Sequence, residues 1–176
     1  RDSNYNTVIN MSEMIIQTEP TPNPNALKFL PNVGVRGNKT PLFYKKDPQN
    51  NPEADAPVAY ALFKIEGVQD VFFGSDFITV GKDEAVEWDS IKSDIIETIK
   101  YHSEGPFVIE AVKPACDDIN SDAGTDKVTK RVKQLLDERV RPAVAMDGGD
   151  IIFHDFKDGT VYLEMYGACS GCPSST

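Results

Sequence analysis

The sequence has few cysteines, histidines and tryptophans. Among 176 residues there are three cysteines, two histidines and one tryptophan. No apolar run approaches the ~20 residues that cross a bilayer, and residues 1–10 lack the apolar core of an intact secretory signal. An odd number of cysteines with one close pair is not typical of a secreted disulfide framework. It suits a reducing compartment, where such a pair is metal-binding or catalytic.

Positive charge is also scarce. The chain carries 18 Lys and Arg against 28 Asp and Glu, a net charge of −10. Because phosphate binding requires a basic face, we expect no nucleic-acid partner, and the lack of a spanning segment indicates no membrane partner. Residues 126–176 carry 7 basic and 8 acidic residues, so the acidity belongs to the earlier part. We interpret that acidity as a solvated surface, with contact to basic partners as the alternative.

Periodicity predicts an α+β unit over residues 14–112. Proline-rich residues 20–24 indicate a turn or an extended segment. Residues 31–53, rich in Pro, Asn, Gly and Lys, indicate a long loop. Apolar spacing predicts helices over 55–65 and from 88 or 89 to before Gly105. Strands are expected over 14–18, 26–30, 68–73, 77–80 and 107–112.

A polar stretch over residues 113–125 indicates a linker, so the predicted domains are 14–112 and 126–176. The second domain should begin with an amphipathic helix that Pro142 limits. A turn over 146–150 and a hairpin should follow, with strands over 151–156 and 160–165 joined by an Asp-Gly turn. The expected fold class is therefore α+β, as two small domains in which antiparallel hairpin strands pack against helices.

The chain stops at Thr176, within the first turn of a helix expected after the cysteine pair. A hairpin with one helix makes a poor core. We therefore expect the second domain to be incomplete, with its final helix missing, and unstable or dependent on a partner in this form.

Cys169 and Cys172 are the candidate metal ligands. Their spacing lets both sulfurs converge on one metal from a single turn. Pro173 suits the first position of a helix, whose N-terminus would stabilise a thiolate at Cys172. Two thiolates are half a tetrahedral site, so the rest must come from a second chain, a substrate or a partner.

The spacing alone leaves three kinds of chemistry open. Two chains could share a zinc ion in a structural Cys₄ site, the pair could exchange disulfides as an oxidoreductase, or it could bind an iron–sulfur cluster. The β-hairpin before the pair counts against the oxidoreductase, since thioredoxin-like pairs lie in a βαβ context. No Ser/His/Asp arrangement or acid/base pair indicates another enzyme.

Three further features have simple interpretations. Cys116 lies beside acidic residues that discourage thiolate formation, and we regard it as incidental. His154 is expected at the surface or half-buried rather than as a further ligand. Gly148-Gly149 is interpreted as a tight turn; the alternative is that it lies beside the cysteine loop and leaves room for a cluster.

Both parts of the sequence resemble one family. The first part resembles the N-terminal domain of Nfu-type proteins, and the second resembles the NifU C-terminal domain. The resemblance covers nearly all of residues 14–176. The segments that carry it are QTEPTPNPNALKFL (17–30), LFKIEGV (62–68), VFFGSDFITV (71–80), LLDERVRP (135–142), DGGDI (147–151) and GACSGCPSS (167–175).

The resemblance implies a non-enzymatic iron–sulfur cluster scaffold or carrier. Two chains would bring their cysteine pairs together, hold a 4Fe–4S cluster between them and pass it to apo-proteins. Cys169 and Cys172 match the family's iron ligands, and Gly167, Gly171 and Pro173 would shape the loop. Implied partners are a second copy of the chain, apo iron–sulfur proteins and the cluster-assembly machinery, in a bacterial cytoplasm or a mitochondrial matrix.

The sequence departs from the family pattern in two places. Residues 31–53 match family sequences poorly, and we expect the helix after the cysteine pair to be missing. The N-terminal domain carries no metal-ligand set, so we assign it to partner recognition.

Overall fold

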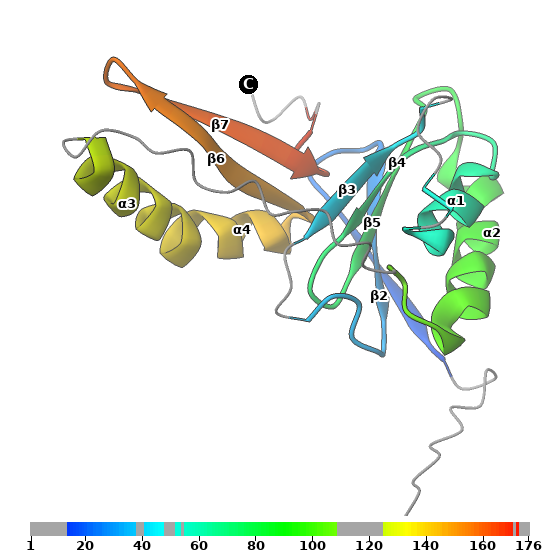
Figure 1. The fold of residues 1–176 in the computed structure, drawn as a ribbon. Helices are drawn as coiled ribbons and strands as arrows, with labels where there is room; N and C mark the ends of the chain where they lie inside the picture. The colour runs from blue at the N-terminus through cyan, green and yellow to red at the C-terminus, as the bar shows by residue number, and fades with distance from the viewer. Residues whose placement is uncertain are drawn as a thin grey trace, which may run out of the picture.

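The chain forms an α+β fold with two antiparallel sheets (Figure 1). A computed structural model describes residues 14–37, 41–47, 52–53, 55–108, 125–170 and 172. The larger sheet has the strand order β1-β2-β5-β4-β3, and every neighbouring pair is antiparallel. Its strands are β1 (Ile16–Pro20), β2 (Ala26–Pro31), β3 (Leu42–Lys45), β4 (Val68–Phe73) and β5 (Ile78–Lys82).

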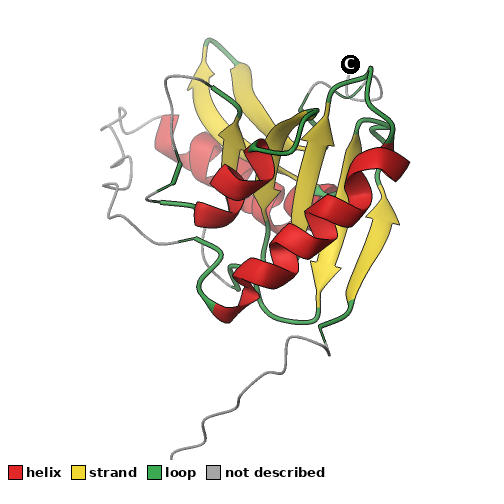
Figure 2. Cartoon of the chain, turned by 90° about the vertical axis from the view of Figure 1, so that its right-hand side faces the viewer, coloured by secondary structure: helices red, strands yellow, loops and turns green. Residues whose placement is uncertain are grey.

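Helices α1 (Pro57–Phe63) and α2 (Trp88–Tyr101) cover one face of this sheet (Figure 2). The stripe of Ile91, Ile95 and Ile99 on α2 is buried, as its spacing predicts. These isoleucines join Phe29, Phe73 and other buried residues in one core between sheet and helices. A short 3₁₀ turn, η2 (His102–Glu104), ends α2 before Gly105.

Alternation along the strands places a second set of side chains on the helix-free face. Phe72 lies between the core residues Val71 and Phe73, and Thr79 lies between Ile78 and Val80. Successive side chains of a strand point to opposite faces, so both turn away from the helices. Yet Phe72 is 1% exposed and Thr79 is fully buried, which means that something else covers this face.

Two predictions for this part of the chain are wrong. Residues 31–53 were expected to be a loop, but β3 forms within them and pairs with β4. The four residues of β3 are too few to show a clear apolar periodicity. They form a strand because they pair with the free edge of β4. Phe107 and Val108 form a bend rather than the start of a strand; residues 109–112 lie outside the described part of the chain.

A second unit follows, with α3 (Thr125–Leu135), a π-helical turn η3 (Leu136–Val140) and α4 (Arg141–Met146). The sequence predicts that Pro142 limits this helical run, and that prediction is wrong: Pro142 lies in the first turn of α4. There its missing N–H costs no hydrogen bond, so helical structure continues beyond it.

Strands β6 (Gly149–Lys157) and β7 (Thr160–Gly167) form the predicted hairpin. Asp158 and Gly159 both have positive φ, at 51° and 78°, as an Asp-Gly hairpin turn requires. The predicted domain limits and the linker remain a prediction, because residues 109–124 lie outside the described part of the chain.

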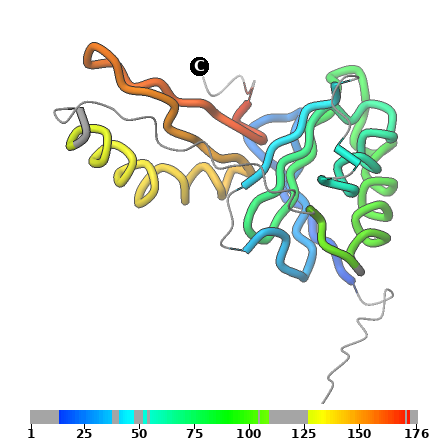
Figure 3. Tube along the Cα trace, viewed as in Figure 1, coloured from blue at the N-terminus to red at the C-terminus, as the bar shows by residue number. Residues whose placement is uncertain are grey.

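The start of β6 and the end of β7 reach the helix-free face of the larger sheet (Figure 3). β7 contacts β4 and β5, and the Phe43 and Tyr166 rings meet edge to face with centroids 5.4 Å apart. The second unit is therefore what covers Phe72 and Thr79. Helices α1 and α2 lie on the opposite side.

The carboxyl group of Asp70 makes the stability of the larger sheet depend on pH. Burial raises its pKa to about 6, and the charge of Lys45 opposes that shift only in part. Between pH 4 and 6 the folded chain keeps a proton that the unfolded chain has lost, so stability falls as pH rises through this window. We expect Asp70→Asn to remove the fall and to stabilise the protein at pH 7.5 by roughly 1–3 kcal/mol.

Urea unfolding at pH 4.5 and 7.5, followed by the fluorescence of Trp88, measures the effect. Asp76→Asn, a change of the same kind at an exposed site, is the control. Equal pH dependence of Asp70→Asn and wild type would contradict the assignment.

Candidate metal centre

The two cysteines lie at the end of β7, where the sequence places them. Ala168, Cys169 and Ser170 form a turn directly after the strand, and the N–H of Ser170 donates to the carbonyl of Gly167 at 3.0 Å. Cys169 is half-buried and Cys172 is 5% exposed, and both are free thiols. Gly171 and Pro173 lie outside the described residues, so the expected helix start at Pro173 stays a prediction.

Glycines bring the start of β6 against this turn. A Cβ on Gly149 would lie 2.8 Å from the Cys169 sulfur and 2.6 Å from the Tyr166 carbonyl oxygen. A Cβ on Gly167 would lie 2.6 Å from the Gly148 carbonyl oxygen, and Gly167 has a φ of +67°. Side chains at these positions would force the backbones apart. Gly148-Gly149 therefore lies beside the cysteine loop, which was the alternative to its interpretation as a tight turn only.

The surroundings of Cys169 are acidic. Burial raises the pKa of this thiol, and the charges of Asp147, Cys172 and Asp150 raise it further. Reactive thiols are found in electropositive surroundings that favour the thiolate. In the absence of a metal this cysteine is therefore held as a thiol, whereas a bound cation would favour its thiolate.

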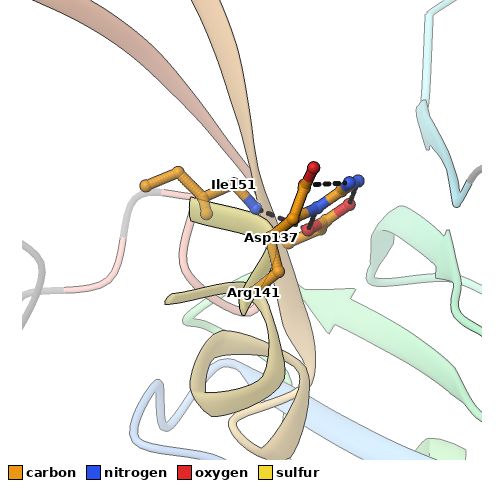
Figure 4. A network of polar contacts seen from close by, with 4 residues as sticks. Asp137, Arg141 and Ile151 are labelled. Atoms are coloured by element: carbon orange, nitrogen blue, oxygen red, sulfur yellow. Dashed lines mark hydrogen bonds and ion pairs between the residues drawn. The ribbon is translucent and has the colours of Figure 1, made fainter. Parts of the chain in front are cut away.

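An ion pair fixes the start of β6 to the helices (Figure 4). The Arg141 guanidinium donates from Nε and Nη2 to the two carboxylate oxygens of Asp150, at 2.9 and 2.8 Å. It also donates to Asp137 at 3.0 Å, and the Asp150 carboxylate accepts the N–H of Ile151 at 2.8 Å. Hydrogen bonding to Asp150 raises the pKa of Arg141, so the guanidinium stays charged. Asp150 is only 4% exposed, and its charge depends on this partner.

The first unit contributes two hydrogen bonds that the sequence did not reveal, one to Ala168 in the cysteine turn and one to Gly148 beside it. The Asn23 side-chain amide donates to the Ala168 carbonyl at 3.1 Å, and the Thr79 hydroxyl donates to the Gly148 carbonyl at 2.7 Å. Both bonds are buried. They join positions 145 and 69 residues apart, and no local pattern could indicate them.

No third metal-binding side chain joins the two cysteines within the described part of the chain. No group of three or more His, Cys, Asp or Glu side chains there could hold a metal ion. Exposed His154 does not join the cysteines in such a group, and Cys116 lies outside the described residues. The described helices also include none that is both long and apolar enough to span a bilayer.

Comparison with known families matches both parts of the chain. Residues 16–105, just over half of it, match the family model described as scaffold protein Nfu/NifU N terminal. Residues 132–176 match the NifU-like domain. The chain belongs to the Nfu/NifU scaffold protein family. The resemblance inferred from the sequence motifs is thus confirmed.

Curated relatives of this Nfu/NifU chain carry the name NFU1 iron-sulfur cluster scaffold homolog, mitochondrial. The one from Drosophila persimilis is 43% identical over 169 residues, which are 95% of this chain and 58% of the relative. The one from Drosophila willistoni is 45% identical over 164 residues, 92% of this chain and 55% of the relative. The chain thus spans little more than half the length of these relatives.

Among solved structures, the solution NMR structure of a NifU-like protein from Saccharomyces cerevisiae is 33% identical. The match covers 56% of this chain and 86% of that chain, with a TM-score of 0.49.

Replacing Arg141 should loosen the β6–β7 hairpin. Arg141→Met leaves the buried Asp150 carboxylate without its cation, a loss of about 1–3 kcal/mol. Hydrogen–deuterium exchange of peptides from β6 and β7 should then be roughly tenfold faster or more. Arg139→Met, which removes an exposed guanidinium two residues away, should leave this exchange unchanged. Equal exchange in the two variants would show that the ion pair does not hold the strand.

Proposed function

We propose that this chain is a non-enzymatic iron–sulfur scaffold and carrier. Cys169 and Cys172 from each of two chains would hold one 4Fe–4S cluster between them and pass it to apo-proteins. The observation that carries the proposal is the pair of free thiols directly after β7, with no third metal-binding side chain beside them in the described part of the chain. A cubane cluster takes four thiolates, so a second chain completes it. Family membership and the printed names of the relatives support iron–sulfur as the cargo.

A site divided between two chains suits transfer. Each thiol gives up a proton when it binds iron, and each iron–thiolate bond can be exchanged for one to a recipient's thiolate without any change in oxidation state. Four ligands from one chain would close the cluster in, whereas two from each of two chains leave it open to exchange.

The surroundings of the cysteines favour this function over a thiol–disulfide oxidoreductase. A thiol–disulfide oxidoreductase needs a stabilised thiolate, but burial and acidic neighbours raise the pKa of Cys169. The pair also follows a β-hairpin rather than lying in a βαβ unit. A zinc-linked dimer would use the same thiols and is distinguished by metal analysis.

The partners and compartment follow from the same proposal. Recipients would be apo iron–sulfur proteins, and donors would belong to the cluster-assembly machinery. The relatives' printed name favours the mitochondrial matrix over a bacterial cytoplasm. The division into domains at 14–112 and 126–176, with a linker at 113–125, is part of this proposal.

Anaerobic reconstitution with ferrous iron, sulfide and a thiol tests the cluster site. We expect a brown protein with broad visible absorption and about two irons and two sulfides per chain. Cys169→Ser and Cys172→Ser should each abolish the absorption, because either change removes two of the four ligands from a dimer.

Cys116→Ser is the matched control and should keep the cluster. An iron-free protein that binds zinc tightly would favour the zinc-linked dimer, and thiol-dependent reduction of insulin would favour the oxidoreductase. Retention of the cluster by both ligand variants would assign it to other residues.

A further inference from the structure

The helix-free face of the larger sheet is built to receive the cysteine loop. Antiparallel sheets commonly leave one face to water, but here Thr79 and Phe72 on that face are buried. Gly167 lies over the Phe72 ring, where a Cβ would come within 3.0 Å of a ring carbon. Gly148 lies over Thr79, and a Cβ there would come within 2.9 Å of the hydroxyl oxygen. The close contact is possible because Gly148 and Gly167 have no side chains and because Thr79, opposite Gly148, is short.

Two carbonyls at the base of the loop are fixed by this face. The Gly148 carbonyl accepts from the N–H of Ala168 at 3.2 Å and from the Thr79 hydroxyl at 2.7 Å. The Ala168 carbonyl accepts from Asn23. Because Ala168 directly precedes Cys169, these bonds determine the path of the backbone into the cysteine turn.

Asn23 is held ready for this contact by its own turn. Its side-chain oxygen accepts the N–H of Asn25 at 3.0 Å, which directs its amide nitrogen toward Ala168. Its carbonyl accepts from the N–H of Ala26 and from the Thr21 hydroxyl, at 3.0 and 2.9 Å. Asn23 is 8% exposed, and no described buried side-chain nitrogen or oxygen lacks a partner. The proline-rich turn before β2 thus presents one amide donor to the cysteine loop.

We propose that the larger sheet docks on the cysteine loop and shields Cys169 and Cys172, and that the hydrogen bonds of Asn23 and Thr79 hold it there. This proposal rests on the proposed function only for the role of the two cysteines as cluster ligands; the docking contacts do not depend on it. In the docked arrangement Cys172 is almost wholly buried and Cys169 is half-buried, so an oxidant or alkylating reagent reaches them slowly. A second chain must reach the same sulfurs to complete a cluster. Loading therefore requires the sheet to release the loop.

The test is the rate at which iodoacetamide labels the cysteines of the metal-free, reduced protein, resolved by peptide mass spectrometry. Thr79→Val keeps the shape of the side chain and removes the donor; we expect labelling of Cys169 and Cys172 to be roughly five- to tenfold faster. Asn23→Asp keeps the oxygen that the Asn25 N–H needs but turns the amide donor into an acceptor facing the Ala168 carbonyl. It should have a similar effect.

Two controls separate the lock from a general loss of structure. Thr79→Ser keeps the hydroxyl and should label at close to the wild-type rate. Thr98→Val makes the same change on α2, where the hydroxyl donates to the Asp94 carbonyl at 2.7 Å, and should also label as wild type. Trp88 fluorescence and far-ultraviolet circular dichroism of each variant verify the fold.

Reconstitution of the same variants distinguishes this proposal from the cluster function. We expect Thr79→Val and Asn23→Asp to form the cluster, at least as fast as wild type. Unchanged labelling would overturn the shield and leave the cluster function standing. If labelling is faster but no variant forms a cluster, the shielding of the cysteines stands and the proposed cluster function is refuted.

Discussion

The arrangement of the cysteines depends on one close backbone approach, between Gly148-Gly149 at the start of β6 and Gly167 at the end of β7. The Gly148 carbonyl accepts the N–H of Ala168, so the chain turns into the cysteine loop at this contact. The Cys169 sulfur then lies against the bare α-carbon of Gly149. The Arg141–Asp150 ion pair holds the same end of β6 to the helices. The sheet docks where these backbones meet, because only glycines let it come so close.

Local chemistry made much of the fold predictable. The isoleucine stripe of α2, the Asp-Gly turn between β6 and β7 and the cysteine turn after β7 each depend on residues near one another in sequence. β3 was missed because four residues carry too little periodicity and their partner strand decides their conformation. Pro142 was misjudged because a proline that ends one helix also suits the first turn of another.

The site was predictable only in part, for the same reason. The cysteine spacing identified the two thiols, and the family resemblance indicated their cargo. Asn23 and Thr79 could not be found from the sequence, since an asparagine in a proline-rich turn and a threonine in a strand are ordinary at those positions. Their role depends on contacts across 145 and 69 residues of chain. Such contacts become visible only when both units are seen together.

Because each chain provides only two of the four proposed ligands, association of two chains is the central requirement of this account. Native mass spectrometry of the anaerobically reconstituted protein tests it most directly. The account predicts one species with the mass of two chains and a single 4Fe–4S cluster, and a single chain once the cluster is removed by acid. A cluster carried by one chain alone would contradict it, because the ligands beyond Cys169 and Cys172 would then come from that same chain.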